Sequence, residues 1–117
     1  MEEQKTVRYK GKQFAVRIIR FVKFLHEEKR CYYDLSRQVL KSGTSIGANV
    51  YESKNAQSRE DFVHKLSIAL KEADETAYWL DVLCGAEIIE QKEYESLNRD
   101  LNEIIALLTS IIKTSKL

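Results

Sequence analysis

Apolar residues recur at alternating intervals of three and four positions along the last part of the chain, and this spacing constrains the fold more than any other feature. The series predicts a helix from about residue 90 to 114 and consists of Tyr94, Leu97, Leu101, Ile104, Leu108 and Ile111. Residues at these intervals lie on one face of an α-helix. A seam about three heptads long suits helices that pack nearly antiparallel, at about 20°. The rest of the chain must therefore supply helices that cover it.

Three further segments have apolar stripes with helical spacing. The first runs from about residue 13 to 28, and its stripe consists of Phe14, Ile18, Phe21 and Leu25. The second runs from about 34 to 56, with Asp34 as its N-cap. The third runs from about 58 to 84; Ser58 and Asp61 resemble a capping box at its start, and Gly85 is placed to end it in a left-handed conformation. The stripe of the third segment consists of Phe62, Leu66, Ala69, Ala73, Thr76, Leu80 and Leu83.

Length and composition fit one helical domain. The chain has 117 residues, no proline and only four glycines, and this length can bury one modest core. We therefore predict an all-α, antiparallel up-down four-helix bundle that spans residues 1–117. Cys31 and Cys84 lack the spacing of a zinc site or a disulfide framework. No apolar run approaches the length of a membrane span, so we expect a cytoplasmic protein that does not enter a membrane.

The stretch SGTSIGANVYES, residues 42–53, places Gly43 and Gly47 four positions apart inside a helical segment. Residues four apart share a helix face, so a neighbouring backbone can approach closely there. The alternative is a break at Gly43 that splits the segment into two short helices. Both interpretations remain open at this point.

The same stretch, together with FVHKLSIALKEADETAYWLDVL, resembles the 23S rRNA intervening-sequence proteins, a family of four-helix bundle proteins. The match to the family's helix-two pattern falls on Ser45, Ile46, Asn49 and Glu52. The chain departs from that pattern where Ser53 replaces a glycine. The resemblance implies a ring-like homo-oligomer, often a pentamer, and no catalytic activity. Related accessory proteins of diversity-generating retroelements bind nucleic acid.

Several apolar residues fall outside the stripes and are candidates for a subunit interface. Exposed apolar patches usually mark interfaces, and Tyr and Trp are favoured anchors there. The candidates are Val16, Phe24, Ile68, Tyr78, Trp79 and Val82. Taken together they favour a homo-oligomer, although each alone fits the wide packing arc of a bundle helix.

Charge is distributed unevenly along a chain whose net charge is +1. From Lys5 to Lys41 eleven Lys and Arg face three acids, a net of +8, whereas from Lys71 to Glu103 three basic residues face ten acids, a net of −7. One interpretation is a basic face that binds the phosphates of RNA or DNA. Its residues are Arg17, Arg20, Lys23, Lys29, Arg30 and Arg37. The other is neutralisation between helices of one chain or of neighbouring subunits.

Asn49, Glu52, Glu72 and Glu75 are the polar residues that we expect to be partly enclosed, as hydrogen-bonding groups that fix the helix register. A buried carboxylate needs a partner, and a Lys or Arg of the first two helices can supply it. A di-iron site in a bundle needs two Glu-x-x-His motifs, and the two histidines of the chain do not provide them.

We therefore expect no enzyme, metal, cofactor or small-molecule substrate. The sequence favours a non-enzymatic, nucleic-acid-associated oligomer. A protein–protein scaffold without nucleic-acid binding is the alternative.

Overall fold

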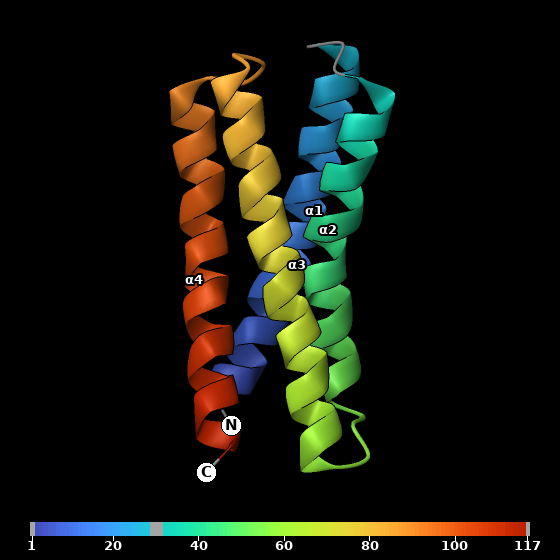
Figure 1. Cartoon of the computed structure of the whole chain (residues 1–117), viewed down its shortest axis with the longest axis vertical. Helices are drawn as coiled ribbons and strands as arrows, with labels where there is room; N and C mark the ends of the chain where they lie inside the picture. Colours follow the sequence, from blue (N-terminus) through green and yellow to red (C-terminus); the bar gives the residue numbers. More distant parts are fainter. Residues whose placement is uncertain (1, 29–31, 117) are drawn as a thin grey trace.

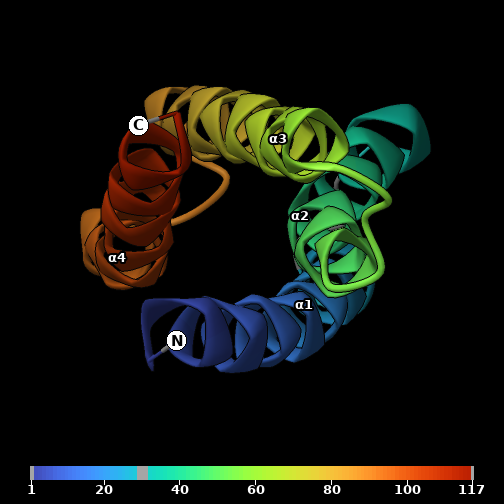
Figure 2. The ribbon, with the colours of Figure 1, turned by 90° about the horizontal axis from the view of Figure 1, so that it is seen from below.

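Four α-helices make up the computed structural model, which describes residues 2–28 and 32–116. They are α1 (Glu2–Glu27), α2 (Tyr33–Ser53), α3 (Arg59–Gly85) and α4 (Gln91–Ser115). Successive helices run in opposite directions along the long axis (Figure 1), and the end-on view shows them in cyclic order (Figure 2). α1 and α4 complete the cycle and pack less extensively than the other neighbouring pairs. The prediction of an all-α, four-helix protein is confirmed, and the described residues form no strand.

Helix α1 begins at Glu2, so the expected start near residue 13 was wrong. Val7 and Gly11 are both buried, and with Phe14 they extend the same alternating spacing toward the N-terminus. The sequence does not reveal this extension, because Gly11 has no side chain and so adds nothing to a stripe of apolar side chains. In the bundle its missing side chain is what lets α2 approach.

Side chains from all four helices form one continuous core. The most deeply buried large residues include Ile18 of α1, Ile46 of α2, Leu80 of α3 and Leu101 of α4, each with no exposed surface. All buried side-chain nitrogen and oxygen atoms of the described residues have a hydrogen-bond partner. Because the buried residues belong to the apolar stripes, these stripes face the inside of the bundle.

Helix α2 is continuous through Gly43, so the alternative of two short helices is wrong. A Cβ atom on Gly47 would lie 2.8 Å from the carbonyl oxygen of Gly11, and one on Gly43 would lie 2.8 Å from the side chain of Ile18. Both distances are shorter than any ordinary carbon contact. The two glycines therefore allow α1 and α2 to pack closely, at the positions that their spacing indicates.

The helix ends follow the predicted caps only in part. The Ser58 hydroxyl accepts a hydrogen bond from the Asp61 N–H at 3.0 Å, as the capping box predicts. Asp34 is not an N-cap, because α2 begins one residue before it, at Tyr33. Gly85 is not left-handed either; Glu87 has that conformation, with φ 61°.

Candidate nucleic-acid interface

The two halves of the bundle differ in charge, and their boundary between α1 and α4 is bridged by ion pairs. Lys10 Nζ lies 2.7 Å from Glu103 Oε2, and Arg17 Nη1 lies 2.6 Å from Asp100 Oδ2. The carboxylate of Glu103 raises the pKa of Lys10, first through the hydrogen bond and then through its charge. Part of the basic charge of α1 is therefore neutralised inside the chain.

Arg17 was expected on the basic face, but its guanidinium is directed to residues of α4. Besides its ion pair with Asp100, its guanidinium donates to the hydroxyl of Ser96 at 2.8 Å and to the Ser96 carbonyl at 3.3 Å. A half-buried guanidinium held in this way joins α1 to α4. Arg17 therefore fits the neutralisation hypothesis better than phosphate binding.

Arg20, Lys23 and Arg37 are exposed and make no ion pair with another described residue. The predicted contributions of Lys29 and Arg30 lie outside the described residues. Four further basic residues, which the sequence prediction omits, share the outer surface of α1 and α2, namely Lys5, Arg8, Lys12 and Lys41. The i, i+4 and i, i+3 spacing of Lys5, Arg8 and Lys12 with Lys23 is the signal that could have found them.

One surface runs over the junction of α1 and α2, and we call it the junction surface. Its α1 residues follow helical spacing and are Arg8, Lys12, Ala15, Ile19, Lys23 and His26. Its α2 residues do the same and are Tyr33, Arg37, Leu40, Thr44, Ala48 and Tyr51. None of these twelve residues is acidic. All are exposed or half-buried, and the close approach of Gly11 and Gly47 brings the two rows together.

Two exposed tyrosines occupy the ends of the α2 row, and each has a cation beside its ring. The Arg37 guanidinium lies 5.7 Å from the ring centre of Tyr33, and the Lys54 ammonium lies 3.8 Å from that of Tyr51. Lys54 lowers the pKa of the Tyr51 hydroxyl, first by a hydrogen bond and then by its charge. The spacing of the two tyrosines along the helix is the sequence signal that could have identified them.

Four of the six expected interface residues lie on α3 and two lie on α1. Trp79 packs against the core, and its indole N–H donates to Glu75 at 3.2 Å. Tyr78 is 61% exposed and contacts the Trp79 ring edge-on, with 5.1 Å between ring centres. Ile68 and Val82 are half-buried on the same helix. On α1, Val16 is half-buried and Phe24 is 37% exposed.

The four expected polar residues make mainly local contacts. Asn49 Nδ2 donates to the Ser45 carbonyl at 2.8 Å, within α2. Glu52 is exposed rather than enclosed, and its carboxylate pairs at 2.9 Å with the half-buried Lys65 of α3. Burial raises the pKa of Glu72, and the neighbouring charge of Glu75 raises it further.

The buried polar link between α2 and α3 comes instead from two hydroxyls that the sequence prediction omits. Thr76 Oγ1 donates to Ser42 Oγ at 2.9 Å. Ser42 is one of the small residues of the glycine stretch, and Thr76 lies in the apolar stripe of α3. This buried hydrogen bond therefore links α2 to α3 through two residues whose positions in the sequence indicate only packing.

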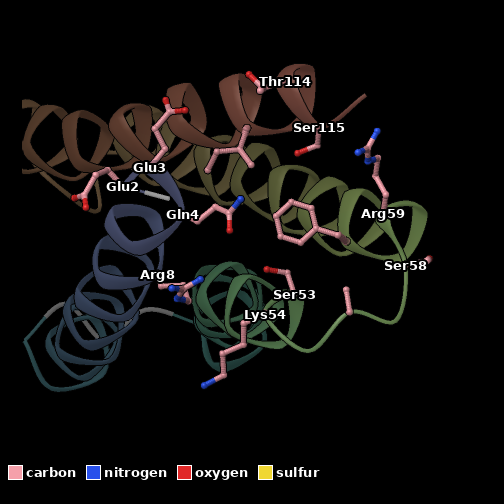
Figure 3. A pocket seen from close by; sticks show the side chains of 13 residues that line it. Glu2, Glu3, Gln4, Arg8, Ser53, Lys54, Ser58, Arg59, Thr114 and Ser115 are labelled. Carbon is pink, nitrogen blue, oxygen red and sulfur yellow. The ribbon is translucent and has the colours of Figure 1, made fainter. Parts of the chain in front are cut away.

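A hollow of about 900 Å³ lies at the end of the bundle where α1 and α3 begin and α2 and α4 end. Phe62 and Ile111 contribute its apolar lining. Figure 3 shows that Arg8, Ser53 and Arg59 reach it from three different helices. Its polar groups come from four helix ends, and they do not gather around one point.

The described part of the chain offers neither a metal site nor a membrane span. No three side chains among its His, Cys, Asp and Glu residues are grouped so that they could hold a metal ion. None of the four helices, over residues 2–28 and 32–116, is both long and apolar enough to cross a bilayer.

Comparison with known proteins identifies the family. The family described as 23S rRNA-intervening sequence protein matches residues 3–110. A solved structure of a protein with unknown function, from the S23 ribosomal protein family of Bacteroides thetaiotaomicron, is 52% identical with a TM-score of 0.92, over 95% of this chain and 98% of that chain. No curated protein matches the chain. Because the family match spans nearly the whole bundle, this chain belongs to the 23S rRNA-intervening sequence protein family.

Proposed function

We propose that this protein is a non-enzymatic nucleic-acid-binding protein that works as a homo-oligomer and contacts phosphates through the outer faces of α1 and α2. One observation supports the proposal most strongly. From Gln4 to His26 the chain has seven Lys and Arg residues and no acid. Two of them pair with α4, which leaves five without an ion-pair partner among the described residues. Clustered cations of this kind bind a phosphate backbone by releasing its counterions.

Charge reversal on the junction surface tests the proposal. Lys12→Glu/Lys23→Glu changes two exposed positions that make no ion pair with another described residue. We expect weaker binding to RNA and DNA, and a slope of log K against log salt that is shallower by roughly 0.7 to 0.9 for each phosphate that the variant no longer neutralises. The measurement is fluorescence anisotropy with labelled single strands and duplexes over a salt series.

The matched control is Lys92→Glu/Lys113→Glu, which makes the same charge change at exposed positions of α4. It should leave the salt slope unchanged. Equal weakening in both double variants would reduce the effect to net charge, and absence of binding by the wild type at low salt would refute nucleic-acid binding altogether.

A scaffold without nucleic-acid binding is the second candidate, and the ion pairs of Lys10 and Arg17 with α4 favour it. In these pairs basic groups of α1 already meet acidic groups of α4 within one chain. If the remaining charges meet a neighbouring subunit in the same way, the basic face is not available to nucleic acid. The salt series separates the two candidates, because only phosphate binding responds to Lys12→Glu/Lys23→Glu and not to the control.

A further inference from the structure

We infer that the junction surface binds single-stranded nucleic acid, with unpaired bases stacked on Tyr33 and Tyr51 and phosphates held by the cations around them. The inference rests on the proposed nucleic-acid binding and names the class of ligand. The evidence for it is that exposed tyrosine rings lie beside the basic side chains of this surface.

Exposed large apolar side chains are concentrated in the basic half of the molecule. Seven are exposed among the described residues, and six of them lie between Tyr9 and Tyr51. Only Tyr78 belongs to the acidic half formed by α3 and α4. A duplex would use the cations alone, because its bases are stacked inside it. Exposed rings beside cations fit a strand whose bases are free to stack.

Tyr33 and its neighbours form the first of two similar units. Tyr33 is 64% exposed, and the guanidinium of Arg37, one turn further along α2, lies over its ring. The imidazole of His26 meets the ring edge-on at 5.8 Å, and His26 Nε2 lies 2.7 Å from the buried Ser36 hydroxyl. The ring is therefore braced from α1 while much of its surface faces solvent.

Tyr51 and Lys54 form the second unit at the other end of the surface. Tyr51 is 60% exposed, and Lys54 stands beside its ring. Tyr33 and Tyr51 are 18 positions apart on one continuous helix. This separation is five turns, so the two rings lie on the same side of α2, roughly 27 Å apart.

The surface between the two units suits a sugar-phosphate chain. Its middle is uncharged and consists of Ala15, Ile19, Leu40, Thr44 and Ala48, and Lys12 and Lys23 flank it from α1. The whole surface has the length of a site for several nucleotides, within the range of about 4 to 16 known for single-strand binders. Along the surface, a tyrosine ring and a cation are followed by the uncharged middle and then by a second tyrosine ring and cation, an order that fits bases on the rings and phosphates beside the cations.

Three labelled probes of equal length test the inference. They are an oligothymidylate of about 16 nucleotides, the same sugar-phosphate chain without bases, and a duplex. We expect the wild type to bind the oligothymidylate at least tenfold more tightly than the abasic chain, as stacking on two rings requires. Tyr33→Ala and Tyr51→Ala should each weaken oligothymidylate binding about tenfold and leave abasic binding unchanged.

Tyr33→Phe and Tyr51→Phe are the matched controls, since they keep the ring and remove only the hydroxyl. They should bind the oligothymidylate as the wild type does, and they keep the test valid if Tyr33→Ala loosens the packing against His26. Equal wild-type affinity for the oligothymidylate and the abasic chain would overturn the stacking inference while the proposed phosphate binding stands. Failure to bind any of the three probes at low salt would overturn both.

Discussion

Gly47 illustrates, at the scale of single residues, how the absence of a side chain stabilises the bundle. A Cβ atom on Gly47 would lie 2.8 Å from the Gly11 carbonyl oxygen and 3.0 Å from the Gly11 carbonyl carbon. Both neighbours are backbone atoms, so they cannot rotate away as a flexible side chain can. A glycine inside a helix costs about 1 kcal/mol relative to alanine, and the close packing of α1 on α2 offsets that cost.

We therefore predict that Gly47→Ala lowers the free energy of unfolding by about 1–3 kcal/mol, and that Gly47→Leu lowers it further. Denaturant unfolding followed by circular dichroism measures both. Gly85→Ala is the matched control, because a Cβ atom there would have no heavy atom within 4 Å. It should be neutral or stabilise the protein by up to about 1 kcal/mol. A Gly47→Ala protein as stable as the wild type would contradict the close-packing account.

Sequence spacing predicted this close approach only from one side. Gly43 and Gly47 stand out because they lie four apart in one helical segment. Their partner Gly11 does not, because a single glycine among charged residues has no periodicity of its own. The packing of two helices is a property of both, and one sequence shows each helix alone.

At the scale of helices and their ends, the connection from α3 to α4 contains a strained residue. Glu87 has φ 61°, a conformation that favours glycine. The Ile88 N–H donates to the Leu83 carbonyl at 2.9 Å, and the Glu87 N–H donates to the Cys84 carbonyl at 3.0 Å. These two bonds form a Schellman motif that closes the end of α3. Glu87 therefore occupies the position that glycine usually takes.

We predict that Glu87→Gly raises the free energy of unfolding by about 1 kcal/mol, because it relieves the left-handed strain without removing either hydrogen bond. Glu95→Gly is the control. It makes the same exchange at an exposed position inside α4 and should lower stability by about 1 kcal/mol. Thermal and denaturant unfolding of the two variants should thus change in opposite directions. The same direction of change in both would mean that the conformation of Glu87 carries no strain.

The elements themselves were the most predictable part of the fold. All four apolar stripes face the core, because burying them is the main way that this chain can remove apolar surface from water. Helix ends were less predictable, since Gly85 and Glu87 compete for the same role two positions apart. The backbone hydrogen bonds of Glu87 and Ile88 to the end of α3 place the left-handed residue at Glu87, and spacing along the chain does not reveal where these bonds form.

At the scale of the whole molecule, the separation of charge between the two halves was visible in the sequence, but its use was not. Arg17 counts as one cation among several in the sequence, whereas the fold places it against Asp100 and Ser96 of α4. Arg20 and Lys23, three and six positions further on, remain exposed. The periodicity of the sequence predicts which residues lie outside the core. Only the arrangement of the helices shows which of these residues contact a neighbouring helix.

The outer face of α3 supports the proposed self-association. Tyr78 is largely exposed, with Ile68 and Val82 half-buried on the same helix. Trp79 is a poor test of an interface, because it also packs against the core and holds Glu75. Tyr78→Glu instead places a charge at an exposed position and leaves the Trp79 hydrogen bond to Glu75 in place.

We predict that light scattering finds the wild type at a multiple of 13.6 kDa, and that Tyr78→Glu shifts the mass toward 13.6 kDa with the helical circular dichroism unchanged. The physical reason is that a buried, unpaired carboxylate at an interface has a large desolvation cost. Tyr32→Glu is the control, because Tyr32 is 81% exposed at the start of α2, far from Tyr78 along the chain. A wild type that is monomeric, or a Tyr78→Glu protein with the wild-type mass, would remove the α3 face from the assembly and leave its apolar residues as local packing.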